Sequence, residues 1–180
     1  MKYDCVVGID PGAGGGIVTW REGYRLVATK MPKDVSELGK YLLYLKSVCN
    51  PIVFVEQINL RPDDVAVEAG SANMGKAFRV QKMVENFAQL KATVAMCGIP
   101  YALVHPLSWQ SRLNVRRSGE SKSERKNRFK RAAERLYPEL NVTLWNADAC
   151  LIMHFGRNEL LSANSKWLRS HLKNDEQKLF

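Results

Sequence analysis

The sequence predicts an α/β fold in which helices flank a mixed five-stranded sheet. Three short apolar segments with short connections occupy residues 4–30, and helical and apolar stretches then alternate along the chain. This order is typical of a mixed sheet covered by helices. A chain of 180 residues with 46% hydrophobic composition fits one domain of ordinary size. We expect residues 1–160 to form this domain and residues 161–180 to form a helical tail.

The N-terminal part predicts an antiparallel meander, then a helix and a buried strand. The three strand-length segments are joined by connections too short for parallel pairing: residues 4–10, 15–21 and 24–30. Asp34 precedes a stretch with apolar residues at helical spacing, which indicates a capped helix over residues 34–49. The apolar segment 51–56 predicts a fourth strand that ends at Glu56.

The remaining sequence predicts four more helices and one more strand, after a polar loop over residues 61–73. Gly98 and Pro100 end the long helix, and Ser121 and Glu124 are spaced as a capping box. The expected elements are a helix over 74–97, a strand over 101–105, a short helix from 106, a basic helix over 121–137 and a last helix over 146–157.

Much of the net charge of +9 lies in one stretch. Between Arg112 and Arg135 there are ten Lys or Arg residues and only three Glu residues. A patch of one sign suits the phosphates of a nucleic acid, although a merely solvated basic helix is the alternative. The candidates for contacts with a nucleic-acid backbone are Arg112, Arg116, Arg117, Lys122, Lys126 and Lys130.

The cysteines and the apolar segments predict a protein of a reducing compartment. Cys5, Cys49, Cys97 and Cys150 lie far apart without a CxxC pair, which predicts free thiols and no structural zinc. No apolar stretch approaches the ~20 residues that cross a bilayer, and the N-terminus lacks the layout of a signal peptide. We therefore expect a cytoplasmic protein without membrane association.

Three acidic residues stand where a charge is costly. Asp10 and Glu56 each end an apolar strand, and Asp148 lies in the apolar setting "NADACLIM". If the first and fourth strands are parallel neighbours, their ends lie ~5 Å apart, and a helix across that edge can bring in Asp148. Clustered carboxylates favour Mg²⁺ or Mn²⁺, and two such ions can assist phosphodiester cleavage. For any one acid alone, a helix cap or an ion pair is the simpler explanation.

Four of these segments carry a resemblance to a known family. "GIDPG", "VFVEQ", "GIPYALVHPLSWQ" and "NADACLIMHFGR" resemble the RuvC family of Holliday junction resolvases, especially its phage-type members. The resemblance implies a ribonuclease H-like fold, a homodimer, and Mg²⁺- or Mn²⁺-dependent cutting of four-way DNA junctions in a bacterial or phage-infected cell. It also implies that Asp10, Glu56 and Asp148 are catalytic metal ligands and that Lys122 lies near the scissile phosphate.

The sequence also departs from the family pattern. The family often has a fourth ligand three residues before the last aspartate, where this chain has Trp145, and Asn146 is the nearest polar substitute. Trp109 and Trp145 could stack on bases or pack in the core. His105 is expected to form a local hydrogen bond, and His154 lies off the face of Asp148. Apolar residues on the long helix from Met74 fit either the core or a dimer contact: Phe78, Val84 and Phe87.

Other functions stay open at this point. The glycines of "GIDPGAGGG", residues 8–16, could cradle a phosphate as in actin-like nucleotide-binding proteins, although that architecture needs two lobes and no GxxxxGK[ST] motif occurs. Bound ATP would then raise the melting temperature. A ribonuclease H-like sheet could instead cut RNA–DNA hybrids, and a junction-binding protein without catalysis is a third possibility.

Overall fold

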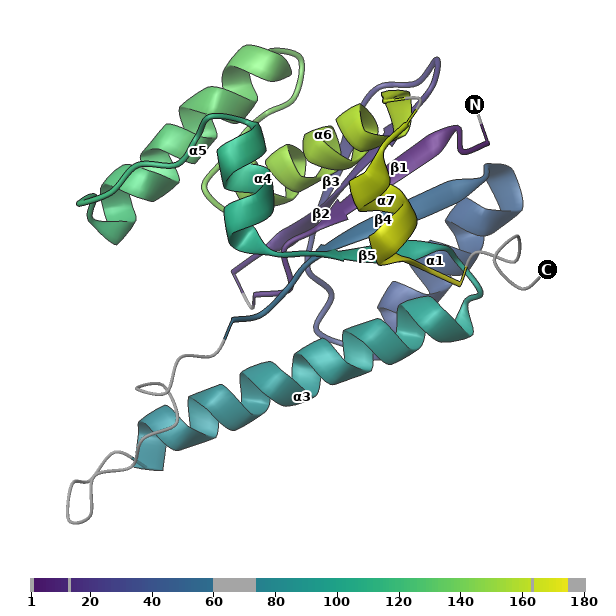
Figure 1. Ribbon diagram of the computed structural model, residues 1–180. Coiled ribbons are helices and arrows are strands. Elements are labelled where there is room, and N and C mark those ends of the chain that lie inside the picture. Colours follow the sequence, from purple (N-terminus) through teal and green to yellow (C-terminus); the bar gives the residue numbers. More distant parts are fainter. Residues whose placement is uncertain (1, 13, 60–73, 163, 175–180) are drawn as a thin grey trace.

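The sheet is mixed, as expected, but it has six strands instead of five. A computed structural model describes residues 2–12, 14–59, 74–162 and 164–174. The strand order is β3-β2-β1-β4-β5-β6, and Figure 1 labels the strands from β1 to β5. The additional strand, β6, has only two residues, Leu172–Lys173, and pairs antiparallel with β5. Two residues are too few to carry an alternation pattern, so this strand has no signal in the sequence.

The other five strands lie where the sequence places them. They are β1 (Cys5–Ile9), β2 (Gly16–Arg21), β3 (Val27–Lys30), β4 (Pro51–Glu56) and β5 (Tyr101–Val104). β1 pairs antiparallel with β2 and parallel with β4, which confirms both the meander and the parallel neighbours. All five residues of β1 are buried, as expected for a central strand covered on both faces.

Helices cover both faces of the sheet. Two lie against one face: α1 (Val35–Val48) and α3 (Met74–Met96). Four lie against the other: α4 (Pro106–Arg112), α5 (Lys122–Leu136), α6 (Ala147–Leu161) and α7 (Lys166–His171). Asp34 caps α1 by accepting a hydrogen bond from the Ser36 amide, and the capping box of Ser121 and Glu124 is present at α5. The loop expected over residues 61–73 lies outside the described residues.

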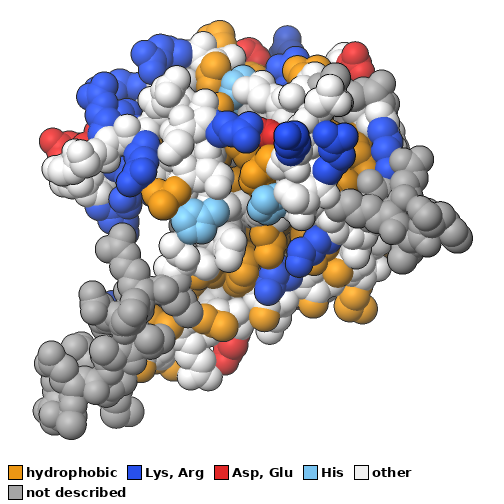
Figure 2. Space-filling model, in the orientation of Figure 1, with side chains coloured by type: hydrophobic (Ala, Val, Ile, Leu, Met, Phe, Trp, Pro, Cys, Tyr) orange, Lys and Arg blue, Asp and Glu red, His pale blue; other side chains and the backbone are white. Residues whose placement is uncertain are grey.

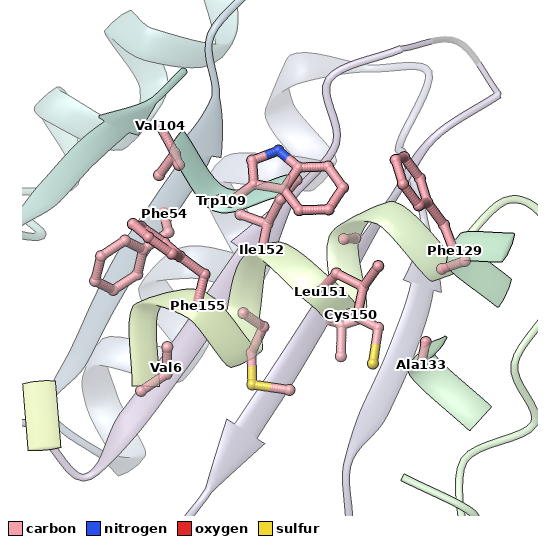
Figure 3. Packing of buried hydrophobic residues seen from close by; sticks show 14 of the residues in the cluster. Val6, Phe54, Val104, Trp109, Phe129, Ala133, Cys150, Leu151, Ile152 and Phe155 are labelled. Atoms are coloured by element: carbon pink, nitrogen blue, oxygen red, sulfur yellow. The ribbon is translucent and has the colours of Figure 1, made fainter. Parts of the chain in front are cut away.

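The C-terminal segment that was expected to be a tail packs on the domain where it is described. Trp167 of α7 stacks against Phe54 of β4 with ring centroids 6.4 Å apart and meets Phe155 of α6 edge-on at 4.9 Å. Figure 3 shows Phe54 and Phe155 beside Val6, Trp109 and other buried side chains that fill this face of the sheet. Trp167, Leu168 and Leu172 therefore pack against this hydrophobic core.

A close approach of α6 to β1 holds the core together. A Cβ atom at Gly8 would overlap the carbonyl oxygen of Ala149 and the amide nitrogen of Met153 in α6. Gly156 has the same role farther along the helix, where a Cβ atom would overlap the ring of Phe54. Glycine at these positions lets the helix backbone lie directly on the sheet.

We predict that Gly8→Ala destabilises the protein by at least about 1–3 kcal/mol, because the added methyl group forces α6 away from β1. Gly39→Ala in α1 is the matched control. Its new methyl group would meet only Thr93 Cγ2 at 3.6 Å, and alanine is preferred over glycine within helices. Unfolding by urea measures both changes, and a Gly8→Ala protein as stable as the control would contradict this account of the packing.

Candidate active site

Two of the three predicted acids meet at the ends of parallel strands. Ile9 of β1 is paired in register with Val55 of β4. Asp10 and Glu56 therefore follow at equivalent positions of neighbouring strands, which lie ~5 Å apart in a sheet. The strand pairing that the sequence predicted accounts for this placement.

Helix α6 brings the third acid to the same place. Asp148 lies in the first turn of α6, which packs against β1 at Gly8. Asp10 and Asp148 are only 9% and 7% exposed. Asp10 interacts electrostatically with Asp148, and Glu56 interacts with both. The three acids that lie far apart in the sequence thus form an acidic centre, the name used below for Asp10, Glu56 and Asp148.

Burial and nearby negative charge oppose the ionisation of Asp10 and Glu56. Burial and the nearby Asp148 raise the pKa of Asp10, against smaller opposite effects of Lys126 and of the Gly12 amide. Burial and the charge of Asp10 raise the pKa of Glu56 to about 7. Carboxyl groups with raised pKa values in one buried place are typical of functional sites.

The glycine-rich turn folds back on Asp10. The Asp10 amide donates to the Gly16 carbonyl at 3.0 Å, and the Gly12 amide donates to Asp10 Oδ1 at 3.3 Å. A Cβ atom at Gly15 would overlap the Asp10 carbonyl. A Cβ atom at Gly16 would come within 2.7 Å of the Trp145 ring. The glycines therefore allow close packing around the carboxylate in the described part of the turn.

Trp109 orients Glu56. This tryptophan is fully buried, meets Phe129 edge-on at a centroid distance of 5.0 Å, and donates from Nε1 to Glu56 Oε1 at 2.9 Å. Of the two roles considered from the sequence, core packing is therefore the one it has. Its hydrogen bond to Glu56 is a positioning role that sequence reasoning missed, because nothing in the pattern of α4 reveals which way the indole points.

Lysines of α5 face the acidic centre. Lys126 Nζ donates to Asp148 Oδ2 at 2.8 Å. A cavity of about 450 Å³ contains Asp10, Lys122 and Lys126 in its lining, together with the glycine turn and Trp145. Lys122 thus lies beside the predicted catalytic acids. Lys126, predicted as a backbone contact, is instead paired with one of them.

Two further candidates for nucleic-acid contacts also hold carboxylates. Arg112 Nη1 pairs with buried Glu159 at 2.5 Å, and Lys130 pairs with Glu134 at 3.5 Å. Arg116 and Arg117 are exposed. A second cavity, of about 510 Å³, is lined by Arg117 and by residues of α5, namely Arg128, Arg131, Glu134 and Arg135. Figure 2 shows Lys and Arg side chains gathered over α5, at the upper left.

The residues near the expected fourth ligand have structural roles. Trp145 packs on Gly16. The Asn146 side chain is 1% exposed; its Oδ1 accepts from the Thr143 amide at 2.7 Å and its Nδ2 donates to the Asn141 carbonyl at 3.1 Å. The Asn146 side chain therefore ties down the loop before α6 and makes no capping bond to the helix itself. His105 caps α4 by accepting from the Leu107 amide, the local bond expected of it.

The acidic centre fits a divalent cation in its chemistry. Asp148 Oδ1 is buried and has no hydrogen-bond partner, and a buried carboxylate oxygen of this kind needs a donor or a cation. In the ranges that the structure describes, no three His, Cys, Asp or Glu side chains are already arranged to hold a metal ion. The Asp148 carboxylate is instead tied to Lys126.

Comparison with solved structures identifies the fold. No protein-family model and no curated protein matches the sequence. The structure of Thermus thermophilus RuvC matches with a TM-score of 0.51 and 18% identity, over 86% of this chain and 95% of that chain. T. thermophilus RuvC in complex with a Holliday junction substrate matches with a TM-score of 0.52 and 15% identity, over 88% and 96%.

The fold is therefore ribonuclease H-like, as the sequence resemblance implied. More particularly, the chain has a RuvC-like fold. None of the described helices is both long and apolar enough to cross a membrane.

The raised pKa of Glu56 predicts how stability depends on pH without divalent cations. The value rises from 4.5 to about 7, so the folded protein binds this proton more tightly than the unfolded chain. Protonated Glu56 stabilises the fold, and the free energy of unfolding in EDTA should therefore fall as the pH rises from 4.5 to about 7. The pKa of Asp10 is also raised, so ionisation of Asp10 likewise lowers the free energy of unfolding as the pH rises.

Glu56→Gln should flatten this dependence, because the amide oxygen can still accept from Trp109 but cannot ionise. Urea unfolding in EDTA at several pH values measures the effect, with Glu22→Gln in the exposed turn after β2 as the control. Equal pH dependence in Glu56→Gln and the unmodified protein would show that this carboxyl does not titrate as described.

Proposed function

We propose that the protein is a structure-selective endodeoxyribonuclease that resolves four-way or branched DNA junctions. The gathering of Asp10, Glu56 and Asp148 at one end of a RuvC-like sheet carries the proposal. The match to RuvC in complex with a Holliday junction substrate supports the choice of substrate. The basic surface of α5 beside the acidic centre suits a nucleic-acid backbone.

The acidic centre would hold Mg²⁺ or Mn²⁺, with two ions per site. Asp10 interacts electrostatically with both other acids and would be the ligand shared by the two ions, while Glu56 and Asp148 would each hold one of them. Divalent cations in such a site activate water and neutralise the leaving 3′ oxygen, giving 5′-phosphate and 3′-hydroxyl ends.

The protein's own groups position the substrate and hold charge. Trp109 fixes the direction of the Glu56 carboxyl group through its hydrogen bond. Gly12 and Gly15, which lie close to Asp10, have no side chains and would leave room for a DNA backbone to approach the cavity. Lys122 is exposed at the same cavity, where its ammonium group would stabilise negative charge on the reacting phosphate.

A homodimer is part of the proposal. The N-terminal half of α3 carries exposed apolar side chains, with Phe78 67% and Val84 42% exposed, whereas Phe87 packs against the core. Large apolar side chains exposed along one helix suit a contact with a second copy of the chain. Two copies would place two acidic centres on one junction, so that two of its four strands would be cut.

The first experiment compares three substrates with and without Mg²⁺: a synthetic four-way junction, a linear duplex and an RNA–DNA hybrid. Paired nicks near the crossover of the junction alone are expected. Asp10→Asn should slow cleavage by at least roughly a hundredfold, since metal ligands contribute several kcal/mol to the transition state, and should still bind the junction because the basic surface is intact.

Glu22→Gln, an exposed acid away from the site, is the matched control and should cut normally. Cleavage by Asp10→Asn at the unmodified rate would contradict the site. Preferential cleavage of the RNA–DNA hybrid would show that the hybrid, and not the junction, is the substrate.

Binding should depend on the arginine-lined cavity. The double change Arg131→Gln with Arg135→Gln removes two of its four arginines. Affinity for a four-way junction should fall, and the slope of log affinity against log salt should become shallower by roughly 1 for each DNA phosphate that the variant no longer neutralises. Arg25→Gln, in the exposed turn before β3, is the control for removal of charge alone. An equal salt slope in the double variant and the control would exclude this cavity as a phosphate site.

A further inference from the structure

Lys126 holds the position of a cation at the acidic centre. Its Nζ atom lies 2.8 Å from Asp148 Oδ2, and its side chain is 28% exposed, against 10% for Asp148. It also interacts electrostatically with Asp10 and Glu56. One ammonium group thus pairs with Asp148 and offsets only part of the negative charge of the acidic centre.

The two carboxylate oxygens of Asp148 differ in their hydrogen bonding. Oδ2 is bound to Lys126, whereas Oδ1 is buried and has no hydrogen-bond partner. A carboxylate that is half satisfied leaves one buried oxygen with its full desolvation cost. A divalent cation at Oδ1 would remove that cost, but it would also meet the positive charge of Lys126 at the neighbouring oxygen.

The ion pair holds Lys126 against Asp148 at the inner side of α5. The neighbour of Lys126 one helical turn earlier, Lys122, lines the same cavity but has no described ion pair. The two lysines have the same charge and different contacts.

We propose that Lys126 is a built-in counter-ion of the acidic centre, which ties down Asp148 until a divalent cation displaces it. This inference rests on the proposed function, because it assumes that the acidic centre binds Mg²⁺ or Mn²⁺. Lys126 competes with the metal for Asp148 and so sets how tightly metal binds. After displacement, its partly exposed ammonium group turns into the cavity beside Lys122, where a DNA phosphate would lie.

The test measures metal binding and stability, not only cleavage. Lys126→Met removes the ion pair and keeps the length of the side chain, Lys126→Arg restores a cation that can pair with Asp148, and Lys122→Met removes an equal charge from the same cavity. Isothermal titration with MnCl₂ gives the affinity of each full-length protein, and melting temperatures are recorded in EDTA and in MnCl₂.

We expect Lys126→Met to bind Mn²⁺ about three- to tenfold more tightly than the unmodified protein, the range for removal of one partly exposed charge pair. It should melt at a lower temperature in EDTA and gain more from Mn²⁺. Lys126→Arg should be close to the unmodified protein in both measurements. Lys122→Met should change the affinity less than Lys126→Met, because only general repulsion is removed.

The unmodified protein provides a second measurement in case Lys126→Met does not fold. Labelling of lysine amines, read by mass spectrometry, should show Lys126 becoming more reactive when MnCl₂ is added, with Lys122 as the internal reference. Unchanged reactivity of Lys126 in a protein that binds Mn²⁺ would overturn the inference.

The outcomes separate this inference from the proposed function. If Mn²⁺ binds equally to Lys126→Met, Lys122→Met and the unmodified protein, Lys126 does not compete with metal, although the proposed nuclease stands. If Mn²⁺ binds to none of them, the metal site and this inference both fail. Tighter binding of Mn²⁺ by Lys126→Met, and not by Lys122→Met, supports both the metal site and the role of Lys126.

Discussion

Carboxyl groups that lie together away from water are unstable, because each loses hydration and each repels the others. Asp10 and Asp148 are buried, and both raise the pKa of Glu56. Protonation, an ion pair or a bound cation can relieve this cost. The structure contains the ion pair of Lys126 with Asp148, the raised pKa of Glu56 favours its protonated form, and the proposed function adds a bound cation.

Several features of the fold bring these groups together. The parallel pairing of β1 and β4 aligns Asp10 with Glu56. Gly8 lets α6 lie on β1 closely enough for Asp148 to reach the same end of the sheet. A side chain at Gly8 would separate the helix from the strand and move Asp148 away. The stability of the core and the geometry of the acidic centre therefore depend on the same contact.

Sequence patterns predicted the parts of the site that belong to regular elements. Strand ends located Asp10 and Glu56, and the apolar run of α6 marked Asp148 as an unusual acid. Side-chain direction was not predictable in the same way. The bond of Trp109 to Glu56 joins residues 53 positions apart and has no local signal. Lys126 lies one helical turn after Lys122, so the spacing predicts that both lysines share a face of the helix. The spacing does not predict that Lys126 pairs with Asp148.

The position of α5 explains why so much of the positive charge lies in one element. Lys126 and Arg131 are five residues apart, which places them about 140° apart around a helix with about 100° per residue. Lys126 faces the acidic centre, whereas Arg131 lines the outer cavity with Arg128 and Arg135. One helix thus presents two basic faces, of which the inner one neutralises the protein's own acids and the outer one is open to a partner. Net charge alone does not separate these roles. Asp148 already balances the charge of Lys126, and Glu120 pairs with Arg128. The positive charge of α5 that is open to a partner therefore includes that of Arg131 and Arg135 on the outer side and that of Lys122 at the inner cavity.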